Sequence, residues 1–196
     1  MSQIEIVAVV FGLFAVWFTV RQNIWCWPMG LVQVSLYIVV FYQVKLYSDL
    51  ILHVIYVGVQ LFGWYHWLHG GRERGKLEVS YLTRLHLFGW VLVVAAGTAS
   101  WGKLMGSLTD AAVPYGDAFT TAASLVAMWL QVEKKVESWA FWIAVDVVAV
   151  GIYSYKGLYP TTGLYAVFLI LSIMGWRQWR SSYRAGVGNW KLETGN

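Results

Sequence analysis

Three residues near the start of a long apolar stretch, Trp139, Trp142 and Asp146, could together bind an organic cation. Their spacings of three and four place the three side chains on one face of a helix. The faces of indole rings attract a cation, and a carboxylate supplies the counter-charge. An acidic side chain costs about 2.5–3.5 kcal/mol near the middle of a membrane helix. Asp146 therefore serves a ligand or, alternatively, a structural hydrogen bond between helices.

Other polar side chains fall at similar depths of the apolar stretches, where membrane transporters normally hold their substrates. Gln33 and Gln60 offer amide groups, and Tyr153 continues the helix face that carries Asp146. Ser124 and Tyr165 add hydroxyl groups, although a serine in a helix also commonly bonds a carbonyl of its own preceding turn. The sequence predicts that these five residues join the first three in a substrate site.

The same stretches exclude several kinds of chemistry. No Lys or Arg lies in the interior of an apolar stretch, so a phosphorylated ligand would lack compensating charge, and a neutral or cationic ligand fits better. No Gly-rich phosphate loop, GxSxG elbow or pair of His at metal spacing within a span is present. Cys26 is the single cysteine, which rules out a disulfide framework. We expect neither an enzyme nor a bound cofactor or metal.

The elements that must position these residues are membrane-spanning helices. Hydrophobic residues make up 59% of the 196 residues, charged residues only 12%, and the mean hydropathy is +0.57. This composition is typical of an integral membrane protein. Apolar runs long enough to cross about 30 Å of hydrocarbon predict seven transmembrane helices, with no separate soluble domain. They cover residues 4–20, 27–44, 50–68, 84–101, 114–131, 139–155 and 158–176.

The distribution of basic residues predicts the orientation of these helices. Seven spans place the two termini on opposite sides of the membrane. The side of the N-terminus carries Lys45, Lys103 and Lys156, whereas the other eleven Lys and Arg lie on the side of the C-terminus. By the positive-inside rule the N-terminus is outside and the tail, residues 184–196, is cytoplasmic. The net charge of +4 reflects this topology, and no nucleic-acid partner is expected.

An internal repeat appears when the chain is shifted against itself so that Trp27 aligns with Trp139, a shift called the repeat offset below. The regions that begin at these two residues then align without a gap, and "LY" and "GWxxW" coincide. A constant offset indicates duplication. Repeat one covers residues 4–68, repeat two covers 114–179, and the helix at 84–101 links them in a 3+1+3 arrangement of parallel repeats. The identical pairs are Trp27/Trp139, Leu46/Leu158, Tyr47/Tyr159, Leu52/Leu164, Gly63/Gly175, Trp64/Trp176 and Trp67/Trp179.

Two local features of the sequence lead to further predictions. Gly63 and Gly175 occupy matching positions in the third and seventh spans, where they would allow close contact between helices. The charged turn "EKKVE", residues 133–137, is predicted to be a solvated helix turn.

The chain also resembles a known family, the PnuC-type vitamin transporters, whose principal member carries nicotinamide riboside. The resemblance covers residues 23–180 and rests on "WPMGLVQVSLYIVVFYQVKLYSD", on "LFGWYHW" and above all on "SWAFWIAVDVVAVGIYSYKGLYPTTGLYAVFLILSIMGWRQW". The family's Asn-Trp-x-x-Trp motif maps onto Trp139 and Trp142. The chain departs from the family at Ser138, where Asn is expected, and at Met128, where Gln is expected. Ser138 and Met128 therefore also belong to the predicted substrate site.

The resemblance implies an activity and an assembly. It implies a homotrimer in the bacterial inner membrane that takes up nicotinamide riboside by facilitated diffusion, with trapping by phosphorylation in the cytoplasm. Thiamine, also a flat cation, stays open as the substrate. A membrane sensor that binds its ligand without moving it is the alternative from another class.

Overall fold

The computed structural model describes residues 3–43, 45, 47–71, 74–108 and 112–194, with side chains for all of these except 47–49, 52 and 187–194. Leu46 and Arg72, which entered the repeat and charge comparisons, lie outside the described residues. The described chain is helical. Its seven helices are α1 (Gln3–Val20), α2 (Cys26–Gln43), α3 (Tyr47–His69), α4 (Arg84–Leu108), α5 (Pro114–Val132), α6 (Ser138–Tyr155) and α7 (Tyr159–Thr194).

Seven helices at the predicted places confirm the all-helical membrane fold. Five of them are long and apolar enough to cross a membrane by themselves, namely α1, α2, α4, α6 and residues 159–186 of α7. Helices α3 and α5 fall short of the same hydropathy because polar residues such as Gln60 and Ser124 interrupt their apolar runs. Both helices hold side chains that are predicted to bind substrate, Gln60 in α3 and Ser124 in α5.

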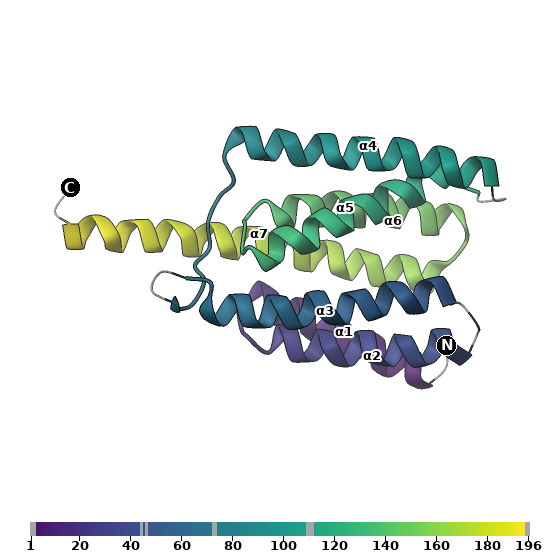
Figure 1. The fold of residues 1–196 in the computed structure, drawn as a ribbon, viewed down its shortest axis with the longest axis horizontal. Coiled ribbons are helices and arrows are strands. Elements are labelled where there is room, and N and C mark those ends of the chain that lie inside the picture. Colours follow the sequence, from purple (N-terminus) through teal and green to yellow (C-terminus); the bar gives the residue numbers. More distant parts are fainter. Residues whose placement is uncertain (1–2, 44, 46, 72–73, 109–111, 195–196) are drawn as a thin grey trace. The chain divides into compact units, whose positions relative to one another are not determined.

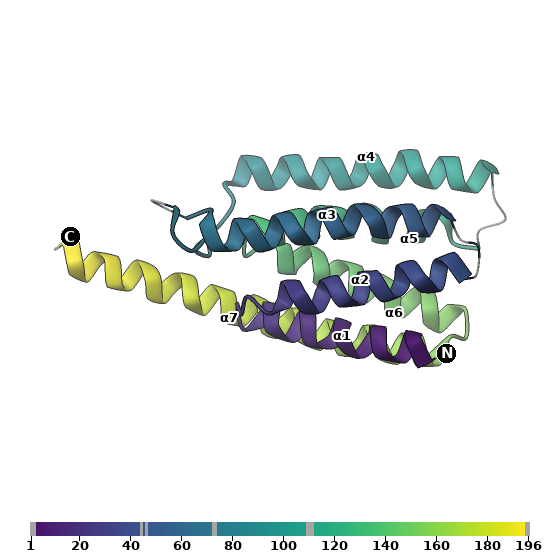
Figure 2. The ribbon, with the colours of Figure 1, turned by 60° about the horizontal axis from the view of Figure 1, so that its bottom comes forward.

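Two helix ends differ from the predicted spans. Helix α4 continues to Leu108, so Lys103 lies within the helix and not in a loop; its side chain is exposed and long enough to reach the membrane surface. Helix α7 continues to Thr194 and extends well beyond the other helices of its unit (Figures 1 and 2). The predicted tail is therefore helical from residue 184 to residue 194.

The chain forms two compact units, Met1–Glu78 and Val79–Asn196. In the first unit α2 packs against both α1 and α3. In the second, α5 packs against α4 and α6, and α6 packs against α7. The core of the second unit joins α4, α5 and α6 through Val94, Ala123, Val126, Ala127, Leu130, Phe141 and Val145. The linker helix α4 thus belongs to the unit that holds repeat two.

The duplication is visible in the packing of aromatic side chains related by the repeat offset. In repeat one, Trp27 meets Trp67 edge to face, with ring centroids 5.3 Å apart and planes at 90°. In repeat two, Trp139 meets Trp179 at 5.4 Å and 87°. Each first tryptophan also covers the glycine at the matching position, Gly63 or Gly175, where a Cβ would clash with its ring. This confirms the close helix contacts expected at these glycines.

The repeat offset also relates the turns between helices. Gln22 and Lys134 both adopt positive φ, 54° in each case, and Lys45 and Gly157 do so with 60° and 69°. The amides that follow the first pair bond equivalent carbonyls, Asn23 N to Phe18 O and Lys135 N to Leu130 O, each at 2.8 Å. A left-handed backbone is uncommon for residues other than glycine. Its recurrence at 22 and 134 shows that the two repeats share their turn geometry as well as their helices.

The expectation of a solvated turn at residues 133–137 is wrong. Lys134 and Glu137 are only 8% and 7% exposed. The Leu82 amide donates to both carboxylate oxygens of Glu137, each at 3.1 Å, and Lys135 Nζ donates to Ser80 Oγ at 2.8 Å. The charges are buried because the segment that leads into α4 crosses this turn and uses them as hydrogen-bonding partners.

Candidate functional site

Asp146 is buried on α6, with an exposed fraction of 3%. Ser172 on α7 donates its hydroxyl to Asp146 Oδ2 at 2.8 Å. No partner for Oδ1 occurs among the described residues. The bond is the interhelical contact that the sequence left as an alternative to a ligand, and it satisfies one carboxylate oxygen of two. The repeat offset pairs these residues with Val34 and Gln60, so repeat one has no equivalent of the carboxylate.

Trp142 lies one helical turn before Asp146 and is held by a different neighbour. Its indole Nε1 donates to Gln131 Oε1 on α5 at 2.8 Å. The ring is partly buried against the core of the second unit. Gln131 was not among the predicted site residues, although it lies three residues after Met128, one turn along the same helix face. The signal in the sequence that could have identified Gln131 is its position as a polar residue at the end of an apolar helix.

Trp139 faces another direction than Trp142. Its ring is 1% exposed, lies against Gly175 and meets Trp179 on α7. Its buried Nε1 has no hydrogen-bonding partner among the described residues, and the same holds for Trp27 in repeat one. The two indoles of the motif thus pack on α7 and α5 respectively, and do not form two walls of one box. The position of Trp139 is that of a packing residue.

The remaining predicted residues of α5 and of the start of α6 are less polar than the family pattern implies. Ser138 is the first residue of α6 and is completely buried, and its hydroxyl lacks a partner within the described part of the chain. Met128 and Ser124 are half-buried on α5. No hydrogen bond is described for the Ser124 hydroxyl.

Tyr153 and Tyr165 stack on each other toward the other end of α6 and α7. Their ring centroids are 5.1 Å apart and their planes differ by 24°. In repeat one the matching residues, Phe41 and His53, also touch, at 4.8 Å. Tyr153 lies seven residues beyond Asp146, which is about 10 Å along the helix axis. The tyrosine pair is therefore about two turns away from the carboxylate.

The two predicted glutamines belong to the first unit and lie over glycines. The Gln33 amide lies where a Cβ of Gly12 would be, and the Gln60 amide lies over Gly30 in the same way. Neither amide has a described hydrogen-bonding partner, and both side chains are half-buried. In repeat two Trp142 stands at the position of Gly30, and Ser172 at that of Gln60. Trp142 and Ser172 make their hydrogen bonds to Gln131 and Asp146 instead, so the two repeats differ at these positions.

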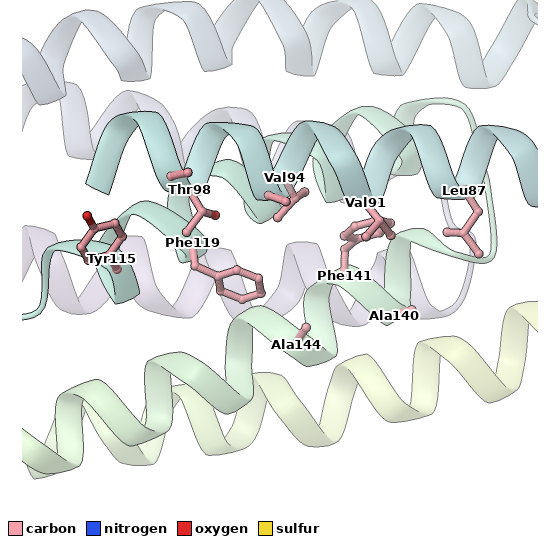
Figure 3. Close-up of a pocket in the computed structure, with 11 residues that line it drawn as sticks. Leu87, Val91, Val94, Thr98, Tyr115, Phe119, Ala140, Phe141 and Ala144 are labelled. Carbon is pink, nitrogen blue, oxygen red and sulfur yellow. The ribbon is translucent and has the colours of Figure 1, made fainter. Parts of the chain in front are cut away.

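An apolar cavity of about 660 Å³ opens between α4, α5 and α6 (Figure 3). Among the residues that line the cavity, Thr98 and Tyr115 are the ones with hydroxyl groups. They lie toward one end of the cavity, and Leu87 lies at the other end. None of the ten predicted site residues lines it. A cavity with this lining does not suit a charged or hydroxyl-rich ligand, which needs hydrogen-bonding partners when it leaves water.

Comparisons with known proteins agree with this architecture. The family described as "Nicotinamide mononucleotide transporter" matches residues 2–181. A crystal structure of the vitamin B3 transporter PnuC superimposes with a TM-score of 0.73 at 27% identity, covering 94% of this chain and 83% of that one.

Three curated relatives are similar over most of the sequence. The nicotinamide riboside transporter PnuC of Escherichia coli is 27% identical, over 94% of this chain and 87% of the relative. The protein of the same name from Neisseria mucosa is 31% identical, over 91% and 72%. The riboflavin/roseoflavin transporter RibM of Streptomyces davaonensis is 26% identical, over 89% and 83%.

Proposed function

Because the chain belongs to the nicotinamide mononucleotide transporter family, we propose that this membrane transporter carries nicotinamide riboside into the cytoplasm. Two relatives, at 27% and 31% identity, are named nicotinamide riboside transporters. Transport, and not ligand sensing or catalysis, is the activity of this chain.

The observation that favours a cationic substrate is the buried carboxylate of Asp146. One of its oxygens is held by Ser172 and the other has no described partner. Nicotinamide riboside is a flat cation with a ribose diol, so Asp146 would balance its charge and the Trp142 ring would bind its pyridinium face. The amides of Gln33 and Gln60, which have no described partners, would bond the ribose hydroxyls.

The other predicted residues take supporting roles in this proposal. Ser124, Met128 and Ser138 would shape the site on the side of α5, where the family pattern places amides at two of these positions. Tyr153 and Tyr165 would close it toward the outside. Trp139 would act through its packing on α7, because its ring is buried against Gly175.

The transport cycle proposed here is a uniport. The two three-helix repeats would expose a midplane site alternately to each side of the membrane, and phosphorylation in the cytoplasm would trap the vitamin. The excess of basic residues supports an N-terminus outside and a C-terminus inside the bacterial inner membrane. The homotrimer is an inference from the resemblance.

Riboflavin is a second candidate because one relative of similar identity is a riboflavin transporter. Its ring system is neutral, so it has no positive charge for a buried carboxylate to balance, and the choice between the two rests on Asp146. The mononucleotide of the family description carries a phosphate, for which no cation lies in the span interiors.

A calorimetric titration of the purified protein with nicotinamide riboside, its mononucleotide, thiamine and riboflavin tests the proposal. We expect binding of the riboside alone. Binding of riboflavin or thiamine alone would keep the family and replace the substrate. For the mechanism, uptake into liposomes is expected to persist when the proton gradient is dissipated, and a collapse of uptake would contradict uniport.

A further inference from the structure

The hydrogen bond between Trp142 and Gln131 is a feature of repeat two that repeat one lacks. At the repeat offset, Gly30 stands in place of Trp142 and Thr19 in place of Gln131. Thr19 bonds a carbonyl of its own helix, Ala15 O, at 2.8 Å. The contacts that the fold itself requires, such as the paired tryptophans, occur in both repeats. The Gln131 bond is therefore not part of the shared scaffold.

This bond lies beside the other asymmetric element, Asp146. Trp142 and Asp146 are four residues apart on α6 and occupy one helix face. Each is tied to a different neighbour, Trp142 to α5 through Gln131 and Asp146 to α7 through Ser172. Both hydrogen bonds are 2.8 Å long, and each joins α6 to a neighbouring helix. Two groups that would face the same ligand are thus each fixed by a neighbouring helix.

A hydrogen bond of this kind fixes the plane of the Trp142 indole ring. An indole on a helix can turn about its side-chain bonds, whereas attraction to a cation requires the ring face, not its edge, within about 6 Å of the charge. An acceptor for Nε1–H restricts that rotation before the ligand arrives. Fixing a binding group in its bound orientation improves affinity by reducing the conformational entropy lost on binding.

We propose that Gln131 is a positioning residue for substrate recognition, which orients the ring face of Trp142 toward a flat cationic ligand next to Asp146. The inference rests on the proposed function, since it assumes that Trp142 faces the substrate. The amide that the resemblance implies at residue 128 is supplied in this chain one turn later, at Gln131. Gln131 acts through Trp142 and need not touch the ligand.

The first test is a double-mutant cycle on the full-length protein, with nicotinamide riboside as the probe. We expect Gln131→Met to weaken binding about tenfold and Gln131→Glu, which keeps an acceptor, to bind within about threefold of the parent. In a Trp142→Phe background, Gln131→Met should change Kd less than twofold, because no indole N–H remains to be held. An equal loss in both backgrounds, or parental affinity of Gln131→Met alone, would overturn the proposal.

Matched controls separate this effect from general damage. Gln178→Met replaces an exposed glutamine of α7, and Trp129→Phe replaces an indole of α5 that is 42% exposed. Both should bind as the parent does. A control as weak as Gln131→Met would show that the loss is not specific to the Gln131 bond.

A second readout needs no ligand. With 5-fluorotryptophan incorporated, the resonance of Trp142 is identified as the one missing from Trp142→Phe. It should shift or broaden in Gln131→Met and stay near its place in Gln131→Glu. An unmoved resonance would refute the positioning role even if the parent protein bound riboflavin. If the Trp142 resonance shifted in Gln131→Met but the parent protein did not bind the riboside, the proposed substrate would be wrong and the positioning role would stand.

Discussion

The contact of Gly175 with the Trp139 ring allows a quantitative test of the duplicated core. A Cβ at residue 175 would lie 2.5 Å from each of three ring atoms, whereas ordinary van der Waals contact begins at 3.4 Å. The ring is 1% exposed and has little free space into which to move. Overpacking of this kind costs about 1–3 kcal/mol, and three simultaneous clashes favour the upper end. The higher helix propensity of Ala recovers about 1 kcal/mol, so the expected net loss for Gly175→Ala is about 2 kcal/mol.

The measurement is equilibrium unfolding in mixed detergent micelles, with tryptophan fluorescence as the signal. Gly163 is the matched control, because it lies in the same helix and a Cβ there would meet nothing within 4 Å. Gly163→Ala should leave the free energy of unfolding unchanged or raise it by up to about 1 kcal/mol. Gly63→Ala should cost about as much as Gly175→Ala, since Trp27 covers Gly63 in the same manner.

Two results would refute this reasoning. If Gly175→Ala unfolded like Gly163→Ala, the ring of Trp139 would not lie against α7. If Gly63→Ala were harmless while Gly175→Ala was costly, the two repeats would not share this core contact.

Three further predictions concern the polar contacts. Asp146→Asn, which keeps an acceptor for Ser172, should weaken binding of nicotinamide riboside at least tenfold in calorimetry and weaken any binding of the uncharged riboflavin much less; equal affinity for the riboside would remove Asp146 from the site. Gly30→Ala should displace the Gln60 amide, 2.5 Å from the new Cβ, and weaken riboside binding, whereas parental affinity would show that this amide makes no contact with the ligand. Glu137→Ala leaves the half-buried Leu82 amide without its acceptor and should lower the free energy of unfolding by about 1 kcal/mol, so an unchanged unfolding curve would contradict the buried turn.

Much of the architecture was readable from the sequence because the membrane restricts it. A spanning segment must satisfy its backbone hydrogen bonds internally, so apolar runs of sufficient length become helices. Their ends follow within a few residues, except that α4 and α7 continue to Leu108 and Thr194. The duplication was also readable, since the repeat offset needs only identities such as Trp27/Trp139 and Gly63/Gly175. The resemblance to the transporter family was recognised from stretches that contain the same residues.

The partners of the polar side chains were decided by the tertiary structure alone. Periodicity placed Trp139, Trp142 and Asp146 on one face of a helix, yet this face borders two helices, and only packing determined which side chain meets which neighbour. Trp139 turned to the glycine of α7 and Trp142 to a glutamine of α5 that the pattern did not single out. The charged turn before α6 was buried for the same reason, because the segment that covers it comes from 55 residues earlier in the chain. A sequence specifies the face of a helix through its period, but the neighbour across that face depends on contacts between segments far apart in the chain.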